Sequence, residues 1–271
     1  MAIGSKTTMI EVRNLTCGYA DQVILQDVSF DVYAGELLFI IGRSGCGKST
    51  LLRCLIGLLK PFRGDIFYSG RSFISADVTQ RREILKTFGV LYQNNALWSS
   101  MTLAENVSLP LEEHASLSRA DREEIVALKL SEVGLAGSEA LYPSELSGGM
   151  KKRAALARSL ALDPPIAFFD EPSEGLDPIT SREMDRLILQ VRDLLGTTMV
   201  IVSHQLSSIF RLADRVLFLD RPTQGILAEG KPRELAAKSK EQRVREFLKQ
   251  DSDSMVPSEG PTAGNAEVGS R

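Results

Sequence analysis

Residues 42–50 read Gly-Arg-Ser-Gly-Cys-Gly-Lys-Ser-Thr, which fits the pattern G-x-x-x-x-G-K-S/T. The apolar run 37–41 precedes this stretch and another begins at Leu51, so we expect a buried strand before it and a helix after it. Glycines let backbone N–H groups curl around phosphate oxygens, Lys48 can reach the β and γ phosphates, and the Ser49 hydroxyl can coordinate Mg²⁺. A chance match is the alternative, and the expected strand and helix argue against it. The stretch therefore predicts a nucleotide-binding loop.

A second polar site follows a later apolar run. Residues 166–172 read Ile-Ala-Phe-Phe-Asp-Glu-Pro, a buried strand that ends in two adjacent acids. Ligands of α/β sheets bind at the carboxyl ends of strands. We expect Asp170 to hold Mg²⁺ through water, and Glu171 to act as general base or to position a water in line with the γ-phosphate. Alone, the pair could equally be two solvated turn acids; beside a phosphate loop, the catalytic interpretation is favoured.

Further runs indicate the fold class. Residues 199–202 and 216–219 are short and wholly apolar, as in strands buried on both faces of a parallel sheet. Residues 28–33 instead alternate apolar and polar side chains, so the first 35 residues are expected to form antiparallel strands. The sequence therefore predicts an α/β fold: a P-loop NTPase core with a mainly parallel sheet and an N-terminal antiparallel β subdomain.

From about residue 95 to 162 the pattern becomes helical. Ser118 and Asp121 are placed as a capping box, and residues 126, 130 and 133 are apolar at the spacing of one helix face. We expect a helical insertion subdomain here, within a single ATPase domain over residues 9–250. Residues 251–271 are rich in Gly, Pro and Ser, so a tail without a fixed fold is expected.

Composition excludes several classes. The 271 residues are 43% hydrophobic and 25% charged with a net charge of −3, so no overall cationic field is available to bind nucleic acid. The apolar runs are far shorter than the roughly 20 residues that span a bilayer, and no secretory signal is evident. The three cysteines lack metal-ligand or disulfide spacing, and Cys46 is interpreted as a small loop residue rather than a nucleophile. A cytoplasmic protein with reduced thiols is expected.

Residues 146–150 read Leu-Ser-Gly-Gly-Met and run into the expected helix from Lys151, a second turn suited to phosphate. Here the sequence resembles the ATP-binding subunits of ABC transporters, whose signature is this Leu-Ser-Gly-Gly stretch and whose order of motifs is reproduced from Tyr19 to about Asp220.

That resemblance implies the residues of the site. Tyr19 would stack on adenine, Gln93 would sense the γ-phosphate and ligate Mg²⁺, and His204 would contact the γ-phosphate as a switch residue. Ser147, Gly148 and Gly149 would contact ATP bound to a second copy of the chain, and Asp177 lies in the loop linking the two sites. The implied nucleotide contacts are Tyr19, Gly42, Arg43, Ser44, Gly45, Cys46, Gly47, Lys48, Ser49, Thr50, Gln93, Ser147, Gly148, Gly149 and Asp177. The implied catalytic residues are Lys48, Glu171 and His204, and the implied metal ligands are Ser49, Gln93 and Asp170.

The resemblance also implies partners. The segment from Gln93 to Met101, with Leu97 and the only tryptophan, Trp98, corresponds to the groove that receives a coupling helix of a transmembrane permease; simple packing of Trp98 within the insertion is the alternative. His114 matches no motif and is expected to be solvated. Gly-Gly-Met and the Gly-Leu-Asp-Pro-Ile run at 175–179 are similar to the MlaF-like branch, which serves MCE-type phospholipid transport between bacterial membranes.

In that branch we expect a permease, an MCE lipid-binding protein and a STAS-domain protein as partners, at the cytoplasmic face of the inner membrane. An ATPase for another small substrate, a cytosolic ABC ATPase of iron–sulfur assembly, and a scaffold that hardly hydrolyses ATP remain alternatives. Glu171 argues against the scaffold, which would need no general base.

Overall fold

A six-stranded sheet lies at the centre of the computed structural model, which describes residues 7–249 of the chain. Its strands are β3 (Leu37–Ile41), β6 (Phe88–Leu91), β7 (Ile166–Asp170), β8 (Thr198–Val202), β9 (Arg215–Asp220) and β10 (Gly225–Gly230). Across the sheet the order is β10-β9-β3-β8-β7-β6. All neighbouring pairs are parallel except β10 with β9. The predicted, mainly parallel sheet is thus confirmed.

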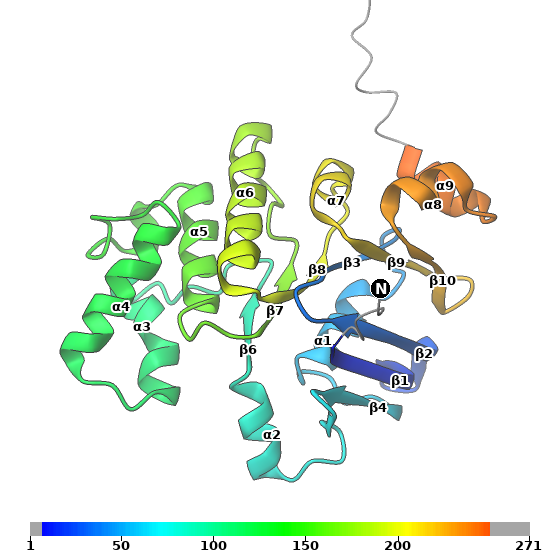
Figure 1. Ribbon diagram of the computed structural model, residues 1–271, viewed down its shortest axis with the longest axis horizontal. Helices are drawn as coiled ribbons and strands as arrows, with labels where there is room; N and C mark the ends of the chain where they lie inside the picture. Colours follow the sequence, from blue (N-terminus) through cyan, green and yellow to red (C-terminus); the bar gives the residue numbers. More distant parts are fainter. Residues whose placement is uncertain (1–6, 250–271) are drawn as a thin grey trace, which may run out of the picture.

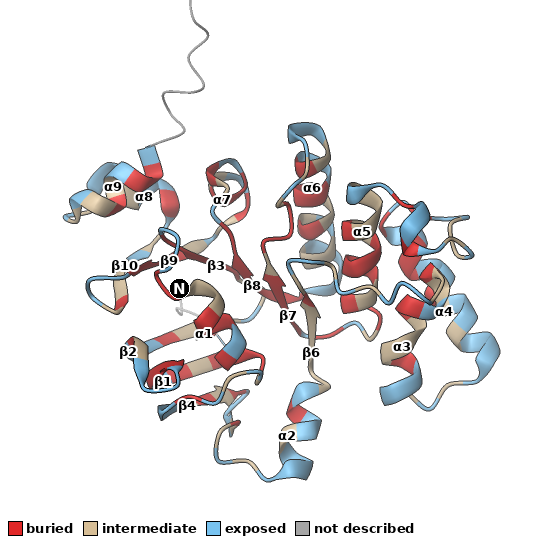
Figure 2. Ribbon diagram, turned by 180° about the vertical axis from the view of Figure 1, so that it is seen from behind, coloured by how far each residue is buried: buried red, intermediate tan, exposed pale blue. Residues whose placement is uncertain are grey.

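Both faces of this sheet are covered, which explains its continuous apolar runs. On β3, Leu37, Phe39 and Ile41 belong to one hydrophobic core, whereas Leu38 and Ile40 belong to a second core. Successive side chains of a strand point to opposite faces, so each face must supply an apolar neighbour. Figure 2 shows the resulting buried strands at the centre of the molecule.

A smaller antiparallel sheet covers one face, as expected for the N-terminal region. Within the described residues it has four strands, in the order β2-β1-β4-β5. They are β1 (Thr8–Tyr19), β2 (Gln22–Tyr33), β4 (Arg63–Tyr68) and β5 (Arg71–Ser72). The apolar residues of the alternating stretch, Val28, Phe30 and Val32, are buried. Helix α1 (Lys48–Leu55) lies between this sheet and the larger one and contacts β1, β7 and β8.

Helices cover the other face and one side of the larger sheet (Figure 1). These are α3 (Leu103–His114), α4 (Arg119–Glu132), α5 (Gly148–Ser159), α6 (Pro178–Leu195), α7 (Leu206–Leu212), α8 (Pro232–Lys238) and α9 (Gln242–Lys249), with a 3₁₀ turn at Pro143–Glu145. Helix α2 (Val78–Leu85) instead lies on the side of α1 and the antiparallel sheet, and its Ile84 is buried in the second core. In the chain, α3, α4 and α5 all fall between β6 and β7, where helical structure was predicted. The first of them begins at Leu103, so residues 95–102 are not helical.

Local signals account for the ends of α4. The Ser118 side chain accepts from the backbone N–H of Asp121, and the Asp121 side chain accepts from that of Ser118, which is the predicted capping box. Gly134 follows the helix with φ +69°, a left-handed conformation that glycine adopts at low cost.

The described part of the chain contains no helix long and apolar enough to span a membrane. The predicted tail, residues 251–271, lies outside the described residues.

Candidate functional site

A pocket of about 600 Å³ opens at the carboxyl ends of the parallel strands. Every residue of the loop 42–50 lines it except Cys46. The other lining residues are Ile24, Gln93, Glu171, Glu174, His204 and Phe247. Because β3, β6, β7 and β8 all end at this edge, the loops that follow them meet here although they are far apart in the sequence.

The loop before α1 is shaped to hold an anion. Gly42, Gly45 and Gly47 have φ of +143°, +75° and +104°, values that L side chains rarely adopt. A Cβ at Gly42 would lie 2.3 Å from the carbonyl oxygen of Leu219, so the backbone itself leaves no room there. The first residue of α1 follows a glycine cap, so no cap side chain occupies the N–H groups of its first turn.

Lys48 and Cys46 point in different directions. The Lys48 ammonium donates to the carbonyl oxygens of Gly42, at 2.8 Å, and Arg43, at 3.3 Å, so it lies over the loop. Cys46 is buried in the core between the two sheets, and burial raises the pKa of its thiol. Its side chain therefore does not line the pocket, and only its backbone remains as the nucleotide contact expected of this residue.

The two acids after β7 differ in their surroundings. Asp170 is the last residue of the strand, and its Oδ1 atom is buried with no hydrogen-bond partner in the described structure. Burial, followed by the charge of Glu171, raises the pKa of this carboxyl. An unpartnered buried carboxylate oxygen is costly unless something fills the position, and carboxylate oxygens are ligands that Mg²⁺ prefers.

Glu171 is buried and has φ +49°, an unfavourable value for a residue with a side chain. Its Oε1 atom lies 2.8 Å from His204 Nδ1, and the backbone N–H of His204 donates to Oε2 at 3.3 Å. An ionised carboxylate only accepts, so Nδ1 carries the hydrogen in this pair and Nε2 is left for another partner. The direct Glu171–His204 contact joins two residues that were assigned separately from the sequence.

Lys152 is a component of the site that sequence reasoning missed. It lies on α5, is 4% exposed, and donates to the backbone oxygens of Gln93, at 2.6 Å, and Glu171, at 3.2 Å. Burial lowers the pKa of this ammonium. The lysine stands in the basic run 151–153, which predicts a solvated helix start rather than a buried cross-link. Glu174 is a second such component: its Oε2 accepts from Gln93 Nε2 at 2.6 Å.

A separate cluster forms where α5 and α6 begin. Ser147 caps α5, and its hydroxyl accepts from the Met150 N–H at 3.2 Å. A Cβ at Gly149 would lie 2.7 Å from the Thr180 methyl, and Thr180 donates to Asp177, which caps α6. The hydrogen bonds from the Thr180 hydroxyl and backbone N–H lower the pKa of the Asp177 carboxyl.

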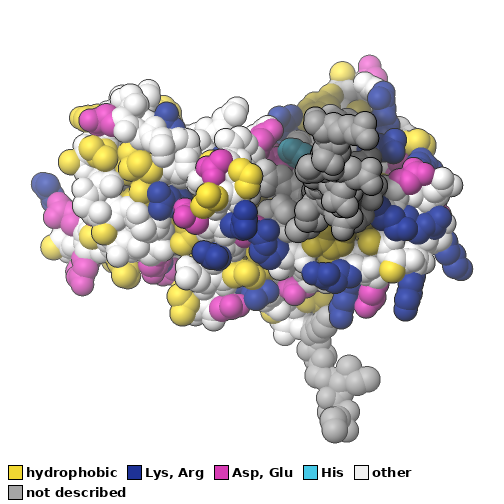
Figure 3. Space-filling model, turned by 90° about the horizontal axis from the view of Figure 1, so that it is seen from above, with side chains coloured by type: hydrophobic (Ala, Val, Ile, Leu, Met, Phe, Trp, Pro, Cys, Tyr) yellow, Lys and Arg dark blue, Asp and Glu magenta, His cyan; other side chains and the backbone are white. Residues whose placement is uncertain are grey.

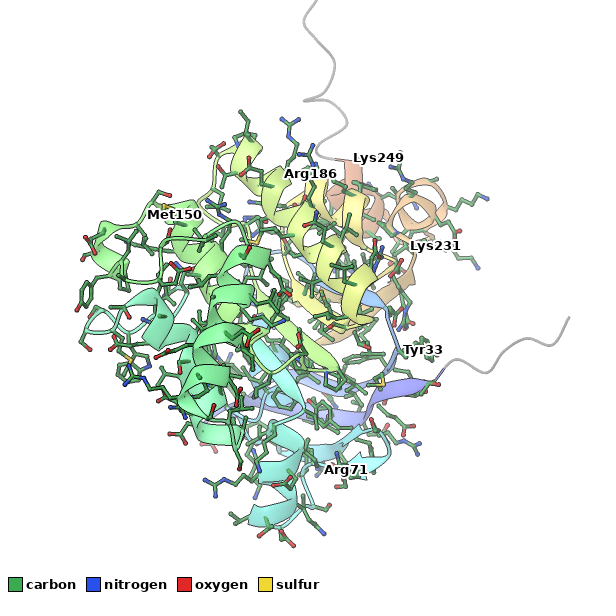
Figure 4. The ribbon with its side chains drawn as sticks, turned by 60° about the vertical axis from the view of Figure 1, so that its left-hand side comes forward. Tyr33, Arg71, Met150, Arg186, Lys231 and Lys249 are labelled. Carbon is green, nitrogen blue, oxygen red and sulfur yellow. The ribbon has the colours of Figure 1, made fainter. Side chains whose placement is uncertain are left out.

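None of the residues of this cluster that were predicted to contact nucleotide lines the pocket. In Figure 4, Met150 lies at the left of the molecule, whereas Lys249 lies toward the upper right; Lys249 ends α9, the helix that contributes Phe247 to the pocket. Tyr19 does not line the pocket either; it is 43% exposed, and its hydroxyl accepts from Arg53 at 2.7 Å.

A second hollow, of about 390 Å³, adjoins the segment that follows Gln93. Trp98 lines it and is 60% exposed, which argues against simple packing within the insertion. Leu97, in contrast, packs against the core. The Arg158 guanidinium also lines the hollow and fixes the neighbouring backbone by donating to the oxygens of Asn95, at 2.8 Å, and Ala96, at 2.6 Å. His114 is exposed, as expected, and also lines this hollow.

Side chains of both signs of charge share one face of the molecule. Figure 3 shows basic and acidic side chains on the same face. Within the described residues, no group of three or more His, Cys, Asp or Glu side chains could hold a metal ion by themselves. A metal in the pocket would therefore need other ligands, such as a hydroxyl, an amide or the nucleotide.

Comparisons with known proteins place the motifs in context. Residues 25–174 match the family described as ABC transporter. The chain is 40% identical to the intermembrane phospholipid transport system ATP-binding protein MlaF of Haemophilus influenzae, over 92% of this chain and 93% of that protein. It is 41% identical to the probable ribonucleotide transport ATP-binding protein mkl of Mycobacterium leprae, over 88% of this chain and 68% of that protein.

Among solved structures, the chain is similar to the dimeric post-hydrolysis state of the ATP-binding cassette MJ0796 bound to ADP and Pi. The TM-score is 0.74 at 28% identity, and the match covers 82% of this chain and 98% of that one.

Proposed function

The chain belongs to the ABC transporter family, and from this we propose that it is the ATP-hydrolysing subunit of a transporter that moves phospholipid between bacterial membranes. The observation that carries the ATPase function is that one pocket combines the loop 42–50 with Gln93, Glu171 and His204. The phospholipid assignment is supported by the identity with MlaF along almost the whole of that protein.

The residues of the pocket divide the work. The loop 42–50 and Lys48 hold the β and γ phosphates, and Tyr19 stacks on adenine. Glu171 is the general base, and its carboxylate takes the proton of the attacking water. Because His204 contacts both carboxylate oxygens, it orients Glu171, and it also contacts the γ-phosphate.

Mg²⁺ would be held by Ser49, Gln93 and Asp170, and the unpartnered Oδ1 atom of Asp170 fits that role. Bound there, the ion would neutralise charge on the β- and γ-phosphate oxygens.

The second turn serves a second copy of the chain. Ser147, Gly148 and Gly149 contact ATP in the pocket of the other protomer, and Asp177 links the two sites. This proposal is supported by the exposed position of Ser147 and Gly148 outside the chain's own pocket, and by the dimeric state named for the related cassette.

The transmembrane permease docks at the hollow beside Trp98, so that movement of the Gln93-to-Met101 segment reaches its coupling helix. An MCE lipid-binding protein and a STAS-domain protein complete the assembly, which places this subunit at the cytoplasmic face of the inner membrane.

Purification of the subunit with its native membrane complex tests the proposal. We expect mass spectrometry to detect bound phospholipid, and ATP to drive the movement of labelled phospholipid. Trp98→Ala should release the permease, whereas Leu128→Ala, at a comparably exposed residue of α4 outside the hollow, should not. A complex that carries no phospholipid and moves another small solute would contradict the lipid assignment. Ribonucleotide is the second candidate, because mkl bears that name.

A further inference from the structure

Gln93 is held at two points from two different elements. Its side-chain Nε2 donates to Glu174 Oε2 at 2.6 Å, and its backbone oxygen accepts from Lys152 at 2.6 Å. Lys152 lies on α5, whereas Glu174 lies in the turn after β7. There the backbone N–H of Glu174 donates to the backbone oxygen of Glu171 at 3.2 Å. The position and the orientation of Gln93 are therefore fixed separately.

Glu174 is an unusual residue for an anion-binding pocket. It lines the pocket with Lys48, Glu171 and Gln93 and is only partly exposed. Within residues 7–249, no Lys or Arg side chain forms an ion pair with Glu174. The Glu174 carboxylate accepts its hydrogen bond from Gln93. A carboxylate beside a phosphate site is repulsive unless it serves another group. Here Glu174 accepts a hydrogen bond from the Gln93 amide, and its charge also acts on the Lys152 ammonium.

The chemistry of this contact determines which way the amide points. A carboxamide has a donor end, Nε2, and an acceptor end, Oε1, and the two ends can exchange by a flip. An ionised carboxylate only accepts, so Glu174 selects the orientation in which Nε2 faces it. The oxygen is then the end left available, and oxygen is the atom that Mg²⁺ binds.

We propose that Glu174 is a positioning residue that orients the Gln93 amide so that Oε1 is presented to Mg²⁺, while Lys152 fixes the Gln93 backbone. This inference rests on the proposed role of Gln93 as a metal ligand. It adds Glu174 as a residue that holds a metal ligand by a hydrogen bond without touching the metal, a role that the sequence motifs do not indicate. Losing such a partner typically weakens metal binding by about 10- to 100-fold, and the exposure of Gln93 favours the lower end.

The test is calorimetric binding of the non-hydrolysable analogue AMPPNP to the full-length chain, with Mg²⁺ and separately with EDTA. With Mg²⁺ we expect Glu174→Ala to weaken binding about tenfold, and with EDTA we expect no weakening. Glu174→Gln retains an acceptor oxygen and should restore most of the affinity. Loss of a negative charge by itself would act in the opposite direction and tighten binding in both conditions, so the sign separates orientation from electrostatics.

Two further variants complete the design. Glu246→Ala is the matched control, because Glu246 accepts from Gln242 Nε2 at 2.7 Å on the exposed face of α9; the affinity of this variant should match that of the unmodified chain. In a Gln93→Ala background, Glu174→Ala should cause no further loss with Mg²⁺.

The possible failures are distinguishable. If Gln93→Ala leaves Mg²⁺-dependent binding unchanged, the proposed role of Gln93 is wrong. If Gln93→Ala weakens it but Glu174→Ala does not, or if Glu174→Ala weakens binding equally in EDTA, the orienting role is overturned while the proposed function stands.

Discussion

The chain contains two glycine-rich turns that each lead into a helix, and they differ in how far they are complete. The turn 42–50 has three glycines in left-handed conformations, a cap without a side chain, and a pocket around it. The turn 147–149 is capped by its own serine, has no glycine of positive φ, and lies outside that pocket. The first turn therefore offers its N–H groups in a pocket that this chain completes by itself, the finished site. The second turn is an exposed helix start outside that pocket, and one of its N–H groups, that of Met150, is already bonded to Ser147.

The largest expected effect belongs to the finished site. Glu171→Gln should leave ATP affinity in place but lower turnover by about 10²–10⁴-fold, the cost of losing a general base. Lys48→Ala should impair nucleotide binding as well, because Lys48 lies over the phosphate loop. Steady-state ATP hydrolysis and calorimetric binding measure the two quantities. Glu183→Gln, on the exposed face of α6, is the control, and unchanged turnover in Glu171→Gln would remove the mechanism.

The finished site could be predicted in outline because its parts are contiguous motifs. Residues 37–50 and 166–171 each combine a buried strand with the polar residues at or after its end, so local pattern determines both structure and chemistry. The weaker strands were missed: β6 is only four residues long, and β10 has a glycine at each end, is mostly only partly buried and pairs antiparallel at an edge.

The contacts that join the motifs could not be read from the sequence. Lys152 reaches Gln93 across 59 positions, and Glu174 reaches it across 81. Such pairs depend on how α5 and the turn after β7 pack together, and a basic run or a turn acid has the same local pattern when it is solvated. Cys46 illustrates the same limit within a motif, because only the packing of the two sheets shows that its side chain leaves the pocket.

An intermediate effect is expected at the second turn. Ser147 and Ser118 both cap helices with a hydroxyl, so replacing either by Ala should lower the free energy of unfolding by about 1 kcal/mol. Only Ser147→Ala should also weaken ATP-driven dimerisation and reduce turnover, by at least about tenfold, since its donors serve the other protomer. Thermal unfolding, light scattering with hydrolysis blocked by Glu171→Gln, and ATP turnover measure these effects. Equal behaviour of the two serine variants in dimerisation would contradict a role for the second turn.

The smallest effect concerns pH. It sharpens the comparison of the two turns, because the site around the first turn includes Asp170, whose Oδ1 atom has no hydrogen-bond partner in the described structure. Burial and the charge of Glu171 raise the pKa of Asp170, so the folded chain takes up this proton at a higher pH than the unfolded chain does. As the pH falls through that pKa, protonation removes the cost of the buried charge, so the free energy of unfolding should rise. The affinity for nucleotide with Mg²⁺ should decline, because the Asp170 carboxylate that would bind the metal becomes neutral. Asp170→Asn should remove both dependences. We expect it to raise the midpoint of thermal unfolding slightly at neutral pH, since it removes a buried charge whose Oδ1 atom has no partner, and to abolish the Mg²⁺ contribution to binding. A variant whose unfolding midpoint falls and whose nucleotide binding still depends on Mg²⁺ would show that Asp170 is a structural acid. The first turn would then need no ligand to satisfy its neighbouring groups, as is already the case for the second.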